Sequence, residues 1–271
     1  MATVKIGGEN TTQAIPIEVI NDPAFPSVPA ACQAQGSDFS ASLEGVVNGI
    51  LGISNFKYDC GPACAANTNP GVYYACNGAS CTATMTPTCS QGVNPIAVFS
   101  QDNNGSFLSL PAVALPWGAA TATGTLIFGI GTQSNNQLPN GAQLFALDRY
   151  GNLPIAVNGT SGTGFIDSGS NGYYTALNLP LCTQSTGFYC PSSPTSVSLQ
   201  LSSGTASANT SITIANADAM FQTGNAALPA LGGTAAITGQ VDLGLPFFYG
   251  RTIGTGIQQV QIPSDYGFVA F

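Results

Sequence analysis

Short runs in which apolar and polar residues alternate recur roughly every ten residues along this chain, a spacing typical of short strands in an all-β protein. Such alternation places successive side chains on opposite faces of a strand. A hairpin is expected over residues 3–20, and one short helical turn over 217–222. The other expected strands lie within 95–100, 106–110, 124–132, 144–157, 196–201, 211–217, 259–262 and 267–271. The pattern therefore predicts an all-β fold.

The composition supports this prediction. Apolar residues make up 44% of the 271 residues, so the chain can bury a substantial core, whereas charged residues make up only 6%. Strands joined by tight turns fit this composition better than helices, whose exposed faces usually carry Glu, Lys and Arg. The apolar content is also too high for a disordered chain. The length suits one large all-β domain or two smaller ones.

The charge balance restricts the partners. The net charge is −8, with 12 acidic residues against 4 basic ones. So few cations argue against a nucleic acid partner and against an anionic membrane surface, and no apolar run is long enough to cross a bilayer. The first ten residues lack the apolar core of a signal peptide, so either a signal has been removed or the chain is a fragment.

The chain contains 8 cysteines at short, irregular spacings. An even number favours disulfides and an oxidising compartment, so we expect a secreted or periplasmic protein. Zinc is the alternative on spacing alone, but the chain has no histidine. We expect no metal and no cofactor. The expected disulfides are Cys182–Cys190, Cys60–Cys64 and Cys76–Cys81.

Composition also suggests two parts. Residues 111–120 contain two prolines and a glycine and are the best candidate for a linker. Residues 57–92 hold five of the cysteines among Gly, Asn and Thr, which indicates a disulfide-stapled insertion. We therefore expect a first part over 1–120, containing this insertion, and a second part over 121–271.

The absence of histidine removes the commonest hydrolytic mechanisms. Ser-His-Asp and Cys-His sites are excluded, as is a zinc hydrolase with histidine ligands. No Gly-rich phosphate-binding loop is present either. The acidic side chains remain, and most of them lie in polar turns, where capping or solvation is a sufficient explanation.

Asp167 differs from the other acids because it directly follows an apolar strand, in the stretch GFIDSGSNG. A carboxylate at the end of a buried strand is a candidate for acid–base chemistry. Ser168 could bond the neighbouring backbone, Gly169 allows a sharp turn, and Ser170 could donate to the carboxylate and orient it. The same residues also suit an ordinary Asx-turn at a strand end, and spacing alone leaves both interpretations open.

The stretch FIDSGSNG resembles the hydrophobic-hydrophobic-Asp-Ser/Thr-Gly-Ser/Thr motif of pepsin-like aspartic proteases. Four further segments resemble parts of that family in the family's order. TVKIGGENTTQAIPIEVI is similar to the segment after the flap, and NGILGISNF to the apolar-Gly stretch of the first lobe. GTLIFGIG is similar to the strand that opens the second lobe, and VDLGLPFFYGRTI to the apolar-Gly stretch and short helix behind the catalytic loop. The last segment and the Cys-rich insertion also resemble an uncharacterised group of secreted bacterial relatives.

This resemblance implies a bilobal β-barrel architecture with a truncated first lobe over 1–120 and a second lobe over 121–271. It also implies hydrolysis of a polypeptide at acid pH by two aspartates, one from each lobe. One carboxylate would activate a water molecule while the other, protonated, polarised the scissile carbonyl. Asp167 would be the second-lobe aspartate, with Ser168 and Ser170 as its hydrogen-bond supports and Gly169 in the turn.

The first-lobe Asp-Thr/Ser-Gly motif and the flap tip are absent from this sequence, so we do not expect a complete enzyme from this chain alone. The missing segment could precede the chain or belong to another one. The protein could instead be a non-catalytic relative, two copies could each contribute Asp167, or the fold could be unrelated. The expected partners are accordingly a polypeptide substrate, a first-lobe segment or a second copy.

A different class of function remains open as well. A secreted, disulfide-stapled β-protein could bind surfaces or associate with itself without catalysis. The tyrosine pairs Tyr73-Tyr74 and Tyr173-Tyr174 would suit such contacts if their side chains were exposed.

Overall fold

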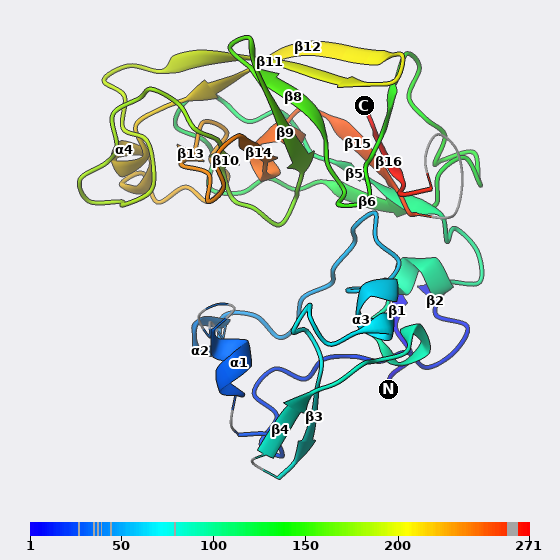
Figure 1. Cartoon of the computed structure of the whole chain (residues 1–271). Coiled ribbons are helices and arrows are strands. Elements are labelled where there is room, and N and C mark those ends of the chain that lie inside the picture. Colours follow the sequence, from blue (N-terminus) through cyan, green and yellow to red (C-terminus); the bar gives the residue numbers. More distant parts are fainter. Residues whose placement is uncertain are drawn as a thin grey trace. The chain divides into compact units, whose positions relative to one another are not determined.

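A computed structural model of the chain describes residues 1–271 except 27, 35, 37, 39, 44, 79 and 259–264, and it leaves the side chains of 41 and 42 undescribed. The chain forms two compact units, Met1–Asn103 and Asn104–Phe271. Both contain strands, and the structure as a whole is mostly β (Figure 1). None of the described helices has the length and apolar character needed to cross a membrane.

The first unit is built from short elements joined by long irregular segments (Figure 1). These elements are β1 (Lys5–Ile6), β2 (Glu9–Asn10), α1 (Ala30–Gln33), α2 (Ser40–Leu43), α3 (Pro62–Ala66), β3 (Tyr74–Asn77), β4 (Ser80–Ala83), η1 (Thr88–Ser90) and η2 (Pro95–Val98). The hairpin expected over residues 3–20 is present in part: β1 pairs with β2, a single bridge joins Ala2 to Ile15, and residues 16–20 are not in a strand.

The strand expected over residues 95–100 is wrong, because Pro95–Val98 forms the 3₁₀-helix η2. The side chain of Asn94 accepts a hydrogen bond from the Ile96 backbone N–H at 3.1 Å and so caps this helix. Pro95 fits the first helical position, where a missing N–H costs nothing. Apolar alternation alone could not distinguish this short helix from a strand.

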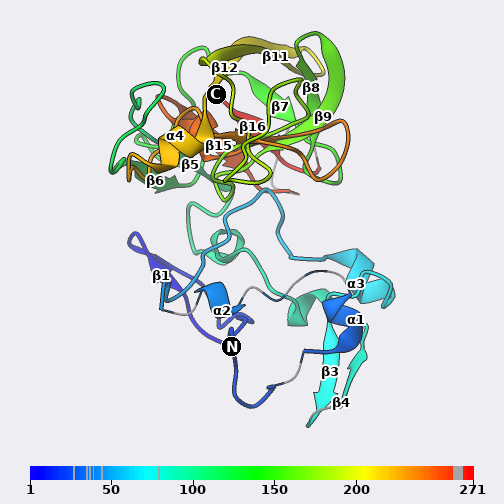
Figure 2. The ribbon, with the colours of Figure 1, turned by 90° about the vertical axis from the view of Figure 1, so that its left-hand side faces the viewer.

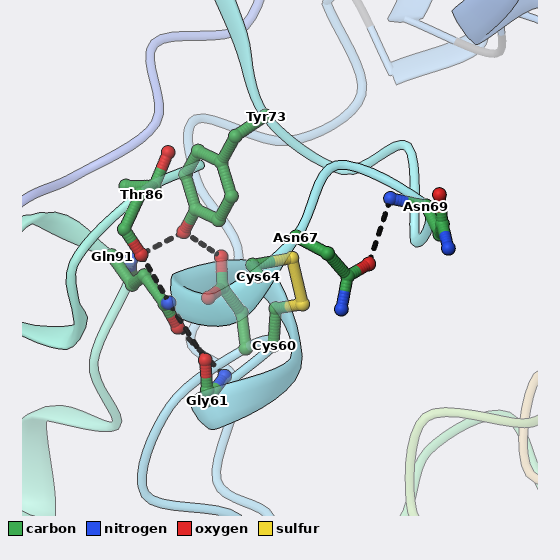
Figure 3. Close-up of a disulfide and its surroundings, with 10 residues drawn as sticks. Cys60, Gly61, Cys64, Asn67, Asn69, Tyr73, Thr86 and Gln91 are labelled. Atoms are coloured by element: carbon green, nitrogen blue, oxygen red, sulfur yellow. Dashed lines mark hydrogen bonds between the residues drawn. A yellow bond between two sulfur atoms is a disulfide. The ribbon is translucent and has the colours of Figure 1, made fainter. Parts of the chain in front are cut away.

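The Cys-rich insertion is held by a disulfide and a polar network around α3 (Figure 3). Gln91 is fully buried, and its amide accepts from the Gly61 N–H at 2.7 Å and donates to the carbonyls of Gly61 and Thr86. The hydroxyl of Tyr73 donates to Asp59 and accepts from the Gly92 N–H at 2.8 Å. Buried polar groups that are satisfied in this way fix a segment that has little apolar core of its own.

The three expected disulfides are confirmed. The structure contains Cys60–Cys64, Cys76–Cys81 and Cys182–Cys190. Among the described residues, Cys32 and Cys89 are free thiols, and Cys89 is exposed. Disulfides of this kind persist in oxidising compartments.

The described residues of the second unit form two sheets and two short helical segments (Figure 1). The five-stranded sheet has the order β6-β5-β15-β16-β7, and the seven-stranded sheet has the order β12-β11-β8-β9-β14-β10-β13. The first sheet consists of β5 (Gly105–Ser109), β6 (Thr125–Phe128), β7 (Leu144–Ala146), β15 (Thr252–Gly256) and β16 (Phe268–Ala270). The second consists of β8 (Leu153–Val157), β9 (Thr160–Ile166), β10 (Tyr173–Tyr174), β11 (Thr195–Ser203), β12 (Ala206–Ile214), β13 (Gly232–Gly233) and β14 (Gln240–Leu243). The helical segments are α4 (Ala217–Phe221) and the 3₁₀-helix η3 (Leu245–Phe248).

Most strands expected in this half of the chain are present, as is the helical turn expected at 217–222. The alternation is clearest in β11, where Val197, Leu199 and Leu201 are buried while the residues between them are exposed. These three side chains belong to the main apolar core of the unit. β11 pairs with β12 on one side and with β8 on the other (Figure 2). The strand expected over 259–262 lies outside the described residues.

The boundary between the two units falls at Asn103–Asn104, whereas the boundary expected from the sequence is at residue 120. The strand β5, which precedes residue 120, pairs with β6 and β15 of the second unit. Residues 111–120 are therefore a connection inside the second unit.

One strand crossing determines the centre of the seven-stranded sheet. β14 comes late in the chain but lies between β9 and β10, parallel to the first and antiparallel to the second. Two glycines allow the backbones to approach this closely. A Cβ at Gly164 would lie 2.0 Å from the Val241 carbonyl oxygen, and a Cβ at Gly244 would lie 2.2 Å from that of Gly172. No side chain fits at either position.

We expect Gly244→Ala to lower the free energy of unfolding by about 3 kcal/mol, because the added methyl group overlaps backbone that cannot move without breaking the crossing. Chemical unfolding with the disulfides intact, followed by circular dichroism, measures this loss. The control is Gly172→Ala, whose Cβ would come no closer than 3.2 Å to the Leu231 carbonyl oxygen and should cost clearly less. Equal losses in the two variants would show that the crossing is not as tight as described.

Candidate functional site

The candidate site is the loop that starts at Asp167, directly after β9. The chain passes behind this loop as it leaves β14. β9 carries the Asp167 backbone out of the sheet, and the Asp167 N–H still donates to the Leu243 carbonyl of β14 at 3.0 Å. Beyond the loop, the Leu245 N–H donates to the Ser170 carbonyl at 2.7 Å. The loop is therefore fastened at two points to the strand that passes behind it.

The carboxylate of Asp167 is held on both oxygens. Oδ1 accepts from the Gly169 backbone N–H at 2.7 Å, and Oδ2 accepts from the Ser170 hydroxyl at 2.9 Å. Asp167 is only partly buried. The bond to Gly169 closes an Asx-turn, and the bond to Ser170 adds a side-chain donor that such a turn does not require. The result is an oriented acceptor at the end of a strand.

Three of the four expected site residues act together in this way, namely Asp167, Gly169 and Ser170. A Cβ at Gly169 would lie 3.0 Å from Asp167 Oδ1, so the glycine also leaves room for the carboxylate. The backbone bond expected of the Ser168 hydroxyl is not found among the described residues.

The structure adds a residue that the sequence analysis did not select. Asp242 lies on β14 between the buried side chains of Val241 and Leu243. It lies opposite Phe165 of β9, two residues before Asp167. An acid in the middle of an apolar stretch, VDLGLPFF, is the sequence signal for this residue.

Burial raises the pKa of Asp242 to about 6, and the negative charge of Asp167 adds to this rise, whereas the hydrogen bond with Ser170 opposes it. Its Oδ1 atom is buried and has no hydrogen-bond partner within the described part of the chain. Burying such an oxygen without a hydrogen bond costs more free energy when the carboxyl is ionised than when it is neutral. Asp242 is therefore poised to hold a proton in mildly acidic solution.

A cavity of about 250 Å³ adjoins Asp242. Phe165 on β9 and Tyr174 on β10 are the cross-strand neighbours of Asp242, so the three side chains share one face of the sheet. The rest of the lining comes from Gln240 and from residues 234–236. Burial raises the pKa of Tyr174, so this phenol stays neutral beside the acid.

Binding of a surface by the two tyrosine pairs would require exposed side chains, and the structure does not give them this exposure. Tyr173 belongs to the core with 4% of its surface exposed. Tyr174, Tyr73 and Tyr74 are each partly buried.

One cluster has the geometry of a metal site but not its chemistry. The ligand atoms of Cys182, Cys190 and Asp218 lie within 4.8 Å of one another. The two sulfurs are joined in a disulfide, so neither is a thiolate that could bind an ion.

We expect Asp242→Asn to stabilise the protein near neutral pH and to have little effect near pH 3. Below pH about 4 the carboxyl is protonated in both the folded and the unfolded chain, so its burial adds no cost. As the pH rises to about 6, the unfolded chain releases its proton while the folded chain retains it, so the wild type loses stability. Because the side chain is partly exposed, the gain in the variant should be about 1 kcal/mol at pH 7.

Chemical unfolding at several pH values between 3 and 8 measures this difference. Asp218→Asn is the matched control of opposite sign, because hydrogen bonds from Ser185 lower the pKa of Asp218. That variant should be less stable than the wild type near neutral pH, and the difference should vanish as the solution is acidified. A pH-independent effect of Asp242→Asn would contradict the elevated pKa of Asp242.

Comparison with known proteins gives a family and no activity. No protein of curated function matches the sequence. Residues 1–271 match the model of a family described as "Protein of unknown function (DUF3443)". The match covers the whole chain, and the protein therefore belongs to the DUF3443 family.

Proposed function

We propose that this protein contributes the second-lobe half of an aspartic-type endopeptidase with pepsin-like architecture, which hydrolyses peptide bonds at acid pH. The observation that carries the proposal is the fixed carboxylate of Asp167 at the exit of β9, with one hydrogen bond to each oxygen. The motif resemblance of FIDSGSNG supports it, as does the passage of β14 behind the loop.

In this proposal Asp167 acts as the general base. Its oxygens are each engaged by one donor, so each retains acceptor capacity for a water molecule. The water would lose a proton to Asp167 as it attacks the scissile carbonyl, and a second, protonated carboxyl would polarise the carbonyl oxygen. In a chain without histidine, carboxylates are the side chains suited to act as a base at acid pH.

The second carboxyl that contacts substrate would come from a first-lobe segment on another polypeptide or from a second copy of this chain. The exposed apolar side chains of the first unit support a polypeptide partner. They include Ile17, Val19, Phe25, Val46 and Ile50, each at least 49% exposed. Exposed apolar side chains are common at sites that bind another protein when they form a contiguous patch. The three disulfides support a secreted or periplasmic location.

Casein cleavage between about pH 2 and 6 tests the proposal, a range in which an aspartate can act as base while its partner is protonated. The assay uses the full chain, alone and joined to any upstream segment that its gene encodes. Where cleavage occurs, Asp167→Asn should reduce the rate at least ~100-fold, since it removes the general base.

The matched control is Asp22→Asn. Asp22 also closes an Asx-turn, by accepting from the Ala24 N–H at 2.9 Å, but it lies in the first unit and lacks the serine donor. This variant should keep full activity. Cleavage that survives Asp167→Asn would refute the assignment. Inactivity of the wild type in every form tested would favour a non-catalytic, disulfide-stapled binding protein.

A further inference from the structure

Among the described strands, β12 pairs only with β11, so it forms one edge of the seven-stranded sheet (Figure 1). An edge strand presents a row of unpaired backbone N–H and C=O groups, to which another strand can add. β12 is 9 residues long and pairs with β11 without a bulge. It contains neither proline nor a charged residue. This edge therefore lacks the features with which proteins commonly block the addition of a strand.

A hydrogen bond at the start of β12 shows which of its backbone groups point away from β11. The Ser207 N–H donates to Gln143 Oε1 at 2.8 Å, and Gln143 lies outside the pair of strands. The direction of the backbone groups alternates along a strand in an antiparallel pair. The N–H and C=O groups of Asn209, Ser211 and Thr213 therefore point outward as well.

The bonding of β11 gives the same orientation independently. Ser198 lies opposite Ser211, and it uses its N–H and its carbonyl on the other side of β11, in bonds of 3.0 and 2.9 Å with Asn158. Two residues directly opposite each other either both face the partner strand or both face away. Within the described part of the chain, no backbone hydrogen bond reaches the outward groups of Asn209, Ser211 or Thr213. Beyond Ser207 the edge is therefore free.

The chemistry of this edge favours a second copy of the same chain as the added strand. The protein has a net charge of −8, yet neither β11 nor β12 contains a charged residue. Two copies can therefore meet at this edge without placing like charges opposite each other. The side chains of Asn209 and Ser211 are exposed, and Thr213 is partly exposed. Hydroxyl and amide groups of this kind hydrogen-bond well across neighbouring strands.

We propose that the free edge of β12 is a self-association surface, at which a second copy of this chain adds its own β12 in antiparallel orientation and extends the sheet. A two-fold axis beside Ser211 places the two Ser211 residues opposite each other, and Asn209 opposite Thr213 of the second copy. Each of these pairs exchanges two backbone hydrogen bonds, because all three residues point outward. The same surface serves both copies, so the assembly closes as a dimer. Only a short stretch of strand is covered, so the dimer is weak and depends on concentration.

The dimer is independent of the candidate site. Asp167 follows β9, which is the fourth strand from this edge of the sheet. Pairing of two β12 strands therefore leaves the two Asp167 loops apart from each other. The inference does not rest on the proposed function, and its test needs no assay of activity.

Sedimentation equilibrium of the full chain between about 1 µM and 1 mM tests the proposal, and we expect a monomer–dimer equilibrium. Ser211→Lys places two ammonium groups opposite each other at the axis and should weaken the dimer about fivefold. Ser211→Pro removes an outward N–H from each copy, which an edge strand tolerates, and should weaken the dimer at least ~10-fold. The matched control is Ser161→Lys, which adds the same charge at an exposed position of β9 and should not weaken the dimer.

Amide hydrogen exchange, followed by NMR, gives a second readout at single residues. The N–H groups of Asn209, Ser211 and Thr213 should exchange more slowly as the protein concentration rises, because the second copy covers them. The N–H of Ser207 should exchange at a rate independent of concentration, because it already donates to Gln143. A monomer over the whole concentration range would overturn the proposal. A dimer that is as stable in both Ser211 variants as in the wild type would overturn it too.

Discussion

The passage of β14 between β9 and β10 is the constraint on which the candidate site depends. It requires backbone-to-backbone contact at Gly164 and Gly244, where any side chain would overlap a carbonyl oxygen. The crossing supplies the Leu243 carbonyl to the Asp167 N–H and the Leu245 N–H to the Ser170 carbonyl. The acidic loop therefore takes its shape from the strand behind it as well as from its own turn residues.

The same crossing explains why two acids lie close together in a protein with so few charges. A strand through the middle of a sheet normally carries apolar residues on a face that is covered. β14 instead carries Asp242 beside the loop that holds Asp167, and burial then favours the neutral form of Asp242. The negative charge of Asp167 adds to the rise in the pKa of Asp242, so the ionisation of the loop carboxylate acts on the acid of the strand behind it.

The two units are stabilised by different means. The second unit has a continuous apolar core under its seven-stranded sheet, with fully buried side chains such as Leu201, Leu243 and Phe247. The first unit relies on two small disulfide loops and on polar networks such as the one around Gln91, while many of its apolar side chains stay exposed. Small segments that cannot bury a large core commonly use such cross-links. A unit of this kind is suited to gain stability from a partner polypeptide, as proposed above.

The sequence by itself determined the strands of the second unit, since period-two alternation as in β11 reflects burial on one face only. It also determined the three disulfides and singled out the loop around Asp167, because cysteine spacing and an acid after an apolar strand are local signals. It failed at Pro95–Val98, where capping by Asn94 outweighed the apolar pattern. Only the tertiary structure decided that Asp242 lies opposite Phe165 on β9, because residues far apart in the chain meet only after β14 has inserted between β9 and β10. The physical reason is that strand order in a sheet depends on long-range packing and close backbone contacts, which no local periodicity encodes.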